Sequence, residues 1–302
     1  MAIVVSFINF KGGVGKTTLS VEIAASLYKK FNSRVLMIDL DPQSNCTLYW
    51  MTEKDWEEHI ENKGTLLNFF EAGLNEKDFD ISSIIAMPSR FKKSAWYSKF
   101  DEIANRGIKL IPSHMELFGV DLKLATKFGF DNPKAQLMLK KAIKPIQNDF
   151  DFIFIDCPPN LYLATQNGLF TSDYYVIVAL AEYLSTLGIA HIQKSINDLF
   201  DKANQIFEFD QKAFNKPELA GVVFNRLRYL TGGTGNEEKW LNKIRSEYGD
   251  LIFDTVIPQS QKIAERPEQS EPIALSDYAA DSQYSNRIHK AAEEFYERIT
   301  RP

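Results

Sequence analysis

Short runs of β-branched and apolar residues recur along the chain, separated by stretches in which apolar positions follow helical spacing. The first run, Ala2–Ile8, has the length and composition of a buried parallel strand. Apolar residues then recur at helical spacing over 19–27, which predicts a helix that begins at about Gly15 or Lys16. Further strands are predicted at 34–38, 107–112, 152–155, 175–180 and 220–224, with a short last one at 255–257.

Helical patterns lie between these strands, for example at 134–147, 185–204 and 237–247. The alternation predicts an α/β fold, with a mostly parallel twisted sheet and helices on both faces. In such folds ligands bind at the carboxyl ends of the strands. Residues 51–106 interrupt the alternation, because they are polar, rich in aromatic residues and weakly periodic. We interpret them as an insertion with short helices and an extra strand at 81–86, within a single domain that covers residues 1–302.

The composition is that of an ordinary globular protein. The 302 residues are 44% apolar and 25% charged, with a pI of about 5.6, which argues against a globally basic nucleic-acid binder. The two cysteines, Cys46 and Cys157, are too few for a disulfide framework and fit a reduced, cytoplasmic setting. No apolar run approaches the roughly 20 residues of a membrane span, and the predicted first strand leaves no room for a signal peptide.

Residues 9–18 read Asn-Phe-Lys-Gly-Gly-Val-Gly-Lys-Thr-Thr and join the first predicted strand to the first predicted helix. The phosphate-loop pattern G-x-x-x-x-G-K-[ST] requires glycine at position 10, where this chain has Phe10 followed by Lys11. The second half of the pattern, Gly15-Lys16-Thr17, is intact. The sequence therefore predicts a nucleotide site with an altered front edge and an additional lysine.

The chemistry of this loop follows from its residue types. Glycines at 12, 13 and 15 allow positive φ angles and a close backbone approach to a ligand. Their N–H groups and the helix N-terminus together form an anion site. Lys16 would reach the β- and γ-phosphates, and the Thr17 hydroxyl would ligate Mg²⁺. A glycine-rich turn with an accidental Gly-Lys-Thr is the alternative, but it does not account for the strand and helix on either side.

Aspartates follow two of the predicted strands directly. Asp39-Leu40-Asp41-Pro42-Gln43 follows residues 34–38, and Asp156-Cys157-Pro158-Pro159 follows residues 152–155. An aspartate at the end of a buried strand is costly to ionise unless it faces a cation or hydrogen-bond donors. Beside a phosphate loop, Mg²⁺ and an attacking water explain these aspartates most simply. Any one of them could instead cap a helix or form a turn.

These motifs resemble those of one family, the deviant Walker A ATPases of the ParA/MinD group. Three segments resemble the family's motifs: Lys11–Thr18, the Asp-Leu-Asp-Pro-Gln segment and Phe154–Pro159. The Asp-Leu-Asp-Pro-Gln segment is similar to that of ParA/Soj rather than that of MinD. Residues 111–117 are similar to the family's segment before its central helix, and residues 257–265 to its late proline loop. The resemblance spans about residues 2–298 and implies a P-loop NTPase fold.

The resemblance implies a role for each of these residues. Lys11 is expected to reach across a nucleotide-sandwich homodimer to the ATP of the partner. The expected catalytic residues are Lys11, Lys16, Asp39 and Asp41. Asp41 is expected to orient the hydrolytic water and Asp39 to support the Mg²⁺ shell, although these two roles could be exchanged. The expected ligands of Mg²⁺ are Thr17, Asp39 and Asp156, the aspartates through water. The residues expected to bind ATP are Gly12, Gly13, Val14, Gly15, Lys16, Thr17, Thr18, Asn225 at the adenine edge and Pro258 on the other wall of the base pocket.

The resemblance also implies partners. ParA proteins bind DNA non-specifically as ATP dimers and are stimulated by a ParB-like protein, so the chain is expected to associate with the nucleoid. Two clusters in which basic residues outnumber acidic ones are candidate DNA contacts: Arg90, Lys92, Lys93, Lys99, Arg106 and Lys109, and Arg226, Arg228, Lys239, Lys243 and Arg245. A solvated surface of mixed charge is the alternative for either cluster.

Other classes of protein are less consistent with the sequence. In the C-terminal segment, Ile288, Ala291, Ala292, Phe295 and Ile299 form one apolar stripe. Its polar face is mixed rather than rich in lysine and arginine, so we expect this helix to pack on the sheet and not on a membrane. A MinD-like or cargo-positioning ATPase that acts on a membrane surface or a protein complex rather than on DNA is the alternative function. A metabolic P-loop enzyme such as an amidoligase stays open, whereas an iron–sulfur electron carrier would need cysteines placed to hold a cluster.

Overall fold

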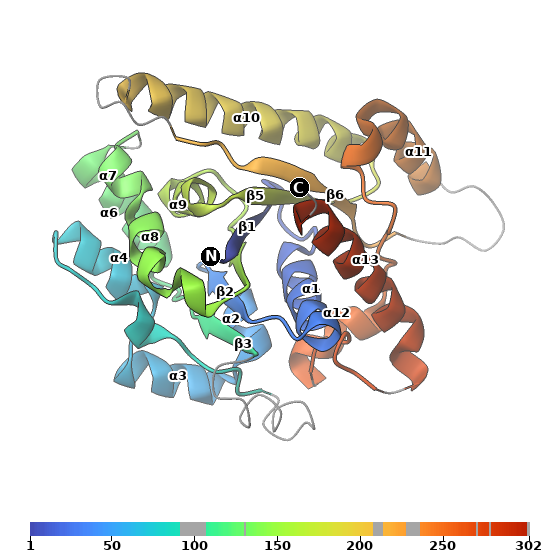
Figure 1. Ribbon diagram of the computed structural model, residues 1–302, viewed down its shortest axis with the longest axis horizontal. Helices are drawn as coiled ribbons and strands as arrows, with labels where there is room; N and C mark the ends of the chain where they lie inside the picture. Colours follow the sequence, from blue (N-terminus) through green and yellow to red (C-terminus); the bar gives the residue numbers. More distant parts are fainter. Residues whose placement is uncertain are drawn as a thin grey trace.

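Six parallel strands form the centre of the protein. The computed structural model describes residues 1–90, 107–129, 131–207, 214–227, 236–269, 271–277 and 279–300. In this part of the chain the strands form one sheet in the order β3-β2-β4-β1-β5-β6, and every adjacent pair is parallel (Figure 1). The strands are β1 (Ile3–Ile8), β2 (Val35–Asp39), β3 (Ile108–Ile111), β4 (Phe152–Asp156), β5 (Tyr174–Ala179) and β6 (Glu218–Phe224).

Helices connect the strands. The helices are α1 (Lys16–Phe31), α2 (Asn45–Trp50), α3 (Glu53–Asn62), α4 (Leu66–Leu74), α6 (Leu117–Phe128), α7 (Pro133–Gln136), α8 (Met138–Ile143), α9 (Leu163–Thr171), α10 (Tyr183–Phe207), α11 (Asn236–Tyr248), α12 (Gln261–Gln269) and α13 (Ser282–Thr300). Short 3₁₀ turns occur at η1 (Ile81–Ile84), η2 (Lys144–Asp149), η4 (Gly249–Leu251) and η5 (Ala279–Asp281). The predicted fold class is confirmed, and the first six predicted strands correspond to β1 to β6.

The two faces of the sheet bury different cores, because successive residues of a strand point to opposite sides. In β4, Phe152 and Phe154 belong to the core under α1 and α13, whereas Ile153 and Ile155 belong to the core under α4, α6, α8 and α9. Near β5 and β6 the second face is covered by α10 (Figure 1). Both faces are therefore covered, as buried parallel strands require.

The predicted apolar stripe of the C-terminal helix packs against the sheet. Ile288, Ala291, Ala292, Phe295 and Ile299 of α13 are all buried. The ring of Phe295 lies edge-on to Phe154 of β4, with centroids 5.4 Å apart. The last described helix thus completes the core over the first strand and the first helix. Among the described residues, no helix has the length and apolar character needed to cross a membrane.

Three local predictions were wrong. Residues 81–86 do not form a strand: Asp80 accepts hydrogen bonds from the N–H and hydroxyl of Ser82, which starts the 3₁₀ turn η1, and only Ala86 bridges to β3. Residues 255–257 make no strand, because the N–H of Thr255 donates to Glu294 instead of to β6. The helix predicted at 134–147 is divided into α7, α8 and η2, and Pro145 lies in the last of these.

The short helices predicted for residues 51–106 are present as α3 and α4. The predicted helices at 185–204 and 237–247 correspond to α10 and α11. Residues 91–106, which include most of the first basic cluster, lie outside the described residues.

The contact between α1 and α13 generates a prediction about pH. His289 of α13 is buried and shares a hydrogen bond of 2.5 Å with the Ser26 hydroxyl of α1. Burial, helped by nearby Lys30 and Lys29, lowers the pKa of His289 to about 4. An unfolded chain has a histidine pKa of about 6.5 and binds the proton first, so the free energy of unfolding should fall as pH drops from 6.5 towards 4.

We expect the parent to lose about 2 kcal/mol more than His289→Asn between pH 7.5 and pH 5.0, because asparagine keeps an acceptor for Ser26 but does not titrate. Urea unfolding of both proteins at the two pH values measures this difference. Equal losses in the two proteins would exclude His289 as the titrating group.

Candidate nucleotide-binding site

The loop between β1 and α1 has the backbone of a phosphate cradle. Gly13 and Gly15 take φ angles of +74° and +90°, which only glycine adopts readily, and α1 begins at Lys16 as predicted. Gly12 does not adopt a left-handed φ, so that part of the expectation was wrong. A Cβ added to Gly15 would collide with the amide nitrogen of Asn225, whereas one added to Gly12 would meet open space.

A cavity of about 380 Å³ opens over this loop. It is lined by Gly12, Gly13, Gly15, Lys16, Thr17, Thr18, Asp41, Gln43, Asn45, Leu48, Tyr49, Pro159 and Arg226. The structure thus brings together most of the predicted phosphate-binding residues and Asp41. Val14 is buried behind the loop and does not line the cavity.

Asp39 and Asp156 lie beneath this cavity, side by side. They end neighbouring strands in register, and both are fully buried. Burial raises the pKa of Asp156 to about 7, and burial together with the nearby Asp156 raises the pKa of Asp39 well above its usual range. Two buried carboxyl groups in contact cannot both ionise without compensation.

Only one of the two carboxylate oxygens of Asp156 has a hydrogen-bond partner among the described residues. Its Oδ2 atom accepts a hydrogen bond of 2.5 Å from the Thr17 hydroxyl. Its Oδ1 atom is buried without a hydrogen-bond partner, which is costly unless a cation or its water fills the space. No cluster of three or more His, Cys, Asp or Glu residues in the described ranges could hold a metal alone.

The two aspartates of the Asp-Leu-Asp segment are placed differently. Asp39 accepts three hydrogen bonds: from the N–H of Asp41 at Oδ1, and from the N–H and hydroxyl of Thr47 at Oδ2. Asp41 lines the cavity, and its Oδ1 atom accepts the N–H of Gln43. For Asp41 Oδ2 the described residues provide no hydrogen-bond partner. Both oxygens of Asp39 are therefore occupied by hydrogen bonds within the protein, while one oxygen of Asp41 is available to a ligand.

Lys11 does not reach into the cavity of its own chain. Its ammonium group pairs with Glu182, the residue before α10, and both side chains are half-exposed. Its backbone N–H is held by the side chain of Asn9 at 2.8 Å, and Asn9 in turn donates to Val178 of β5. Asn9 thereby attaches the front of the loop to the end of β5. The sequence did not predict Glu182 as the partner of Lys11.

A second cavity, of about 340 Å³, continues from the first. It is lined by Thr18, Asn225, Arg226, Pro258, Gln259, Ser260, Gln261 and Ile263, so Thr18 and Arg226 line both cavities. Asn225 and Pro258, the two residues expected at the base, both line this cavity. The Asn225 amide donates to Val14 O at 3.0 Å and accepts the N–H of Arg226, which leaves its second N–H to meet a ligand.

Arg226 has a different role from the one that the sequence indicated. We counted it among the basic residues, but its guanidinium donates to the carbonyl of Gly13 at 2.8 Å. It therefore lies between the phosphate cavity and the base cavity. Its position directly after Asn225 was the only signal in the sequence, and the structure shows the residue in a left-handed conformation with φ of +58°.

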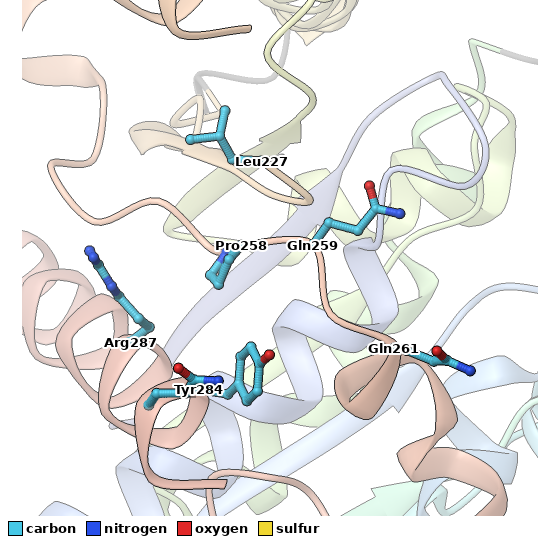
Figure 2. A pocket seen from close by; sticks show the side chains of 7 residues that line it. Leu227, Pro258, Gln259, Gln261, Tyr284 and Arg287 are labelled. Carbon is cyan, nitrogen blue, oxygen red and sulfur yellow. The ribbon is translucent and has the colours of Figure 1, made fainter. Parts of the chain in front are cut away.

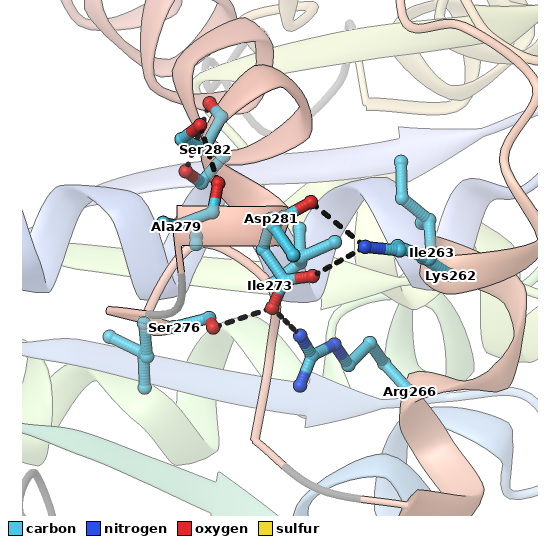
Figure 3. Close-up of polar contacts among 12 residues, drawn as sticks. Lys262, Ile263, Arg266, Ile273, Ser276, Ala279, Asp281 and Ser282 are labelled. Carbon is cyan, nitrogen blue, oxygen red and sulfur yellow. Dashed lines mark hydrogen bonds and ion pairs between the residues drawn. The ribbon is translucent and has the colours of Figure 1, made fainter.

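The Pro258 segment also borders a third hollow. Figure 2 shows Leu227 and Pro258 on one side of it and Tyr284 and Arg287 of α13 on the other, around a cavity of about 690 Å³. The adjoining helix α12 is held by Lys262 and Arg266, which both reach the buried carboxylate of Asp281 (Figure 3). The wall of the base cavity is thus fastened to the start of α13.

The two basic clusters are only partly described. Lys92, Lys93, Lys99, Arg106 and Arg228 lie outside the described residues. Arg90 is used within the chain, since it donates to the carbonyls of Leu48 and Met51. Lys109 lies over the ring of Phe150, and Arg245 donates to the carbonyl of Asp254. Lys239 and Lys243 of α11 are exposed.

Comparison with known proteins gives consistent matches. A family model described as AAA domain matches residues 2–209. The chromosome-partitioning ATPase Soj of Treponema pallidum is 25% identical over 293 residues, 97% of this chain and 96% of that protein. McdA from Cyanothece has a TM-score of 0.70 at 19% identity and covers 99% of this chain and 100% of its own. Cobyrinic acid a,c-diamide synthase from Mycobacterium smegmatis, solved with ADP and magnesium, has a TM-score of 0.62 at 26% identity, with 89% and 92% covered.

The glycine geometry generates a prediction about stability. Gly15→Ala should lower the free energy of unfolding by at least about 1 kcal/mol, because it places a side chain at a left-handed φ and against the Asn225 amide. Gly12→Ala is the matched control and should change it by less than about 0.5 kcal/mol. Denaturant unfolding without nucleotide measures both. A Gly15→Ala protein as stable as the control would contradict the described loop.

Proposed function

The chain belongs to the AAA domain family, and from this membership we propose that it is a Mg²⁺-dependent ATPase of the ParA/Soj type, which dimerises with ATP and partitions or positions DNA. The resemblance to ParA/Soj ATPases predicted from the motifs is confirmed by the Soj relative. One observation carries the proposal: Lys16 and Thr17 on α1, Asp41 after β2 and the Asp156 oxygen without a partner, at the end of β4, converge at one edge of the sheet.

The two connected cavities support ATP as the nucleotide. The N–H groups of Gly13 to Thr18, at the start of α1, would bind the phosphates, and Lys16 would pair with the β- and γ-phosphates. The base would lie between Asn225 and Pro258. The M. smegmatis synthase, which is 26% identical, was solved with ADP and magnesium, and this supports the same ligand class here.

Thr17 and Asp156 would hold Mg²⁺, and the orphaned Oδ1 atom of Asp156 fits such a role. When bound, the ion would neutralise charge on the phosphate oxygens and orient them for transfer. Asp39 would contribute through water, since both its oxygens already accept hydrogen bonds from the chain.

Asp41 is the better candidate for orienting the attacking water. The sequence left open which of Asp39 and Asp41 orients the water and which supports the Mg²⁺ shell. Their different contacts support the assignment of the water to Asp41. Asp41 lines the phosphate cavity and has an oxygen free for a ligand, whereas Asp39 is fully buried and accepts three hydrogen bonds from the chain. A carboxylate must be within hydrogen-bond reach of the water that it orients.

Lys11 would act on the ATP of a second protomer. Its ammonium group lies outside its own phosphate cavity, at the exposed front of the loop. In a homodimer that buries this front, a lysine facing the partner's phosphates would neutralise developing charge as an arginine finger does. Glu182 would then be its partner only in the separate protomer.

DNA is the cargo that we favour. The name of the Treponema relative states chromosome partitioning. Of the basic residues predicted as DNA contacts, Lys239 and Lys243 are exposed on α11. A dimer would present each of these lysines twice. Binding to the phosphates of DNA requires only a local cluster of positive charge, not a basic protein. We further propose stimulation by a ParB-like protein and association with the nucleoid.

A metabolic P-loop enzyme is the second candidate, because the M. smegmatis synthase shares the fold at 26% identity. Such an enzyme would turn over a small substrate and would not need DNA. A membrane-bound regulator is disfavoured, since the apolar stripe of α13 is already buried in the core.

The lysines of the loop give a direct test. Lys16→Ala should abolish ATP binding, whereas Lys11→Ala should keep ATP binding, lose stable ATP-dependent dimers and hydrolyse about 10³-fold more slowly, the lower end of arginine-finger effects. Nucleotide binding, light scattering and phosphate release measure the three properties. Lys30→Ala, a lysine at the end of α1 that pairs with Glu293, is the control and should behave like the parent. Unchanged turnover in Lys11→Ala would remove its proposed role.

DNA retardation tests the cargo. We expect retardation only with ATP and Mg²⁺, weaker at 200 mM than at 50 mM salt, as counterion release requires. Lys239→Ala with Lys243→Ala should reduce the slope of log affinity against log salt by about one for each DNA phosphate that the variant no longer neutralises. Lys134→Ala with Lys202→Ala, which removes two lysines paired with Glu76 and Asp131, is the control. Binding without ATP, or none at low salt, would favour the metabolic alternative.

A further inference from the structure

One hydroxyl group connects the two aspartates of the Asp-Leu-Asp segment to the neighbouring strand. Thr47 of α2 is fully buried, and its hydroxyl donates to Asp39 Oδ2 at 2.7 Å. The same hydroxyl oxygen accepts the backbone N–H of Ser113, which follows β3, at 2.9 Å. The Thr47 side chain therefore joins the ends of β2 and β3.

The direction of these bonds is fixed by chemistry. A backbone N–H can only donate, so the Thr47 oxygen accepts from Ser113, and the single proton of the hydroxyl remains to be donated to Asp39. Asp39 also accepts the N–H of Thr47 at 2.8 Å and the N–H of Asp41 at 3.1 Å. Each of its oxygens thus serves as an acceptor, and the orientation of the Asp39 carboxylate is determined by Thr47 on one side and Asp41 on the other.

Asp41 is held at both of its peptide groups by the same network. Its N–H donates to Asp39, and its carbonyl accepts the Ser113 hydroxyl at 2.7 Å and the Ser44 N–H at 2.8 Å. Ser113 in turn is fixed by its bond to Thr47 and by the indole N–H of Trp56, which donates to its carbonyl at 3.1 Å. The position of the Asp41 side chain in the cavity therefore depends on a chain of buried bonds that passes through Thr47.

We propose that Thr47 is a positioning residue for ATP hydrolysis: its hydroxyl fixes Asp39 and Ser113, and through them the carboxylate of Asp41 that faces the phosphate cavity. The inference rests on the proposed ATPase function. No hydrogen bond of the Thr47 side chain goes to the phosphate loop or to α1, where the nucleotide is held. Loss of this hydroxyl should consequently change the rate of hydrolysis and not the binding of ATP.

Two substitutions separate positioning from packing. Thr47→Val keeps the shape of the side chain and removes the hydroxyl, whereas Thr47→Ser keeps the hydroxyl and removes a methyl group. Steady-state hydrolysis of MgATP by the whole protein should show that Thr47→Val lowers kcat about 10- to 100-fold, the cost of a misplaced catalytic group, and leaves KM for ATP within about two-fold. Thr47→Ser should keep kcat within about three-fold of the parent.

Thr171→Val is the matched control, because Thr171 is a buried threonine whose hydroxyl donates to the carbonyl of Asn167, away from the site. It should hydrolyse ATP like the parent. Ser113→Ala, which removes the hydroxyl on Asp41 O, gives an independent variant should Thr47→Val fail to fold, and it should lower kcat without raising KM.

The outcomes are distinguishable. A parent protein that does not hydrolyse ATP overturns the proposed function and this inference with it. An active parent with unchanged kcat in Thr47→Val, or in Ser113→Ala if that is the variant that folds, overturns this inference alone. If kcat falls equally in Thr47→Ser and Thr47→Val, in step with their stability in urea, Thr47 has only a packing role and the inference is wrong.

Discussion

The rest of the site depends on one electrostatic constraint: Asp39 and Asp156 end neighbouring strands in register, buried and side by side. Two carboxylates in that position must be compensated, and the protein does so differently for each. Asp39 is surrounded by three donors from its own segment. Asp156 receives one, from Thr17, and keeps an oxygen without a partner. The oxygen without a partner belongs to the same carboxyl group that accepts the Thr17 hydroxyl, so the less compensated aspartate is the one that contacts the phosphate loop.

Another buried carboxylate, Glu22, connects the helix that follows the phosphate loop to the C-terminal part of the protein. It lies within α1, and it accepts the hydroxyl of Tyr49 and the N–H groups of Ile273 and Ala274, each within 2.9 Å. Burial raises the pKa of Glu22, while these three bonds favour its charged form. The helix that follows the phosphate loop is in this way joined both to α2, beside Asp41, and to the segment that follows the base-pocket helix α12.

Local patterns in the sequence predicted the sheet, the phosphate loop and the strand-end aspartates, because buried parallel strands are continuous apolar runs and glycine marks the turn. They did not predict contacts that depend on the fold. The strand expected at 81–86 is replaced by a turn that Asp80 stabilises, and the N–H of Thr255 is taken by Glu294, 39 residues later in the chain. The roles of Thr47 and Ser113 and the contact of Arg226 with Gly13 were missed for the same reason: ordinary residue types acquire such contacts only when segments distant in sequence become neighbours.

The packing of α13 on β1 and α1 has a consequence for the time at which the site forms during synthesis. The β1–α1 unit carries the phosphate loop, but part of its apolar surface is covered only by residues 282–300. A growing chain folds from its N-terminus and cannot complete this core before those residues have left the ribosome. Nascent chains that lack residues 282–300 would therefore carry the loop on an incompletely packed support, and a fully packed β1–α1 unit forms only after those residues have been synthesised.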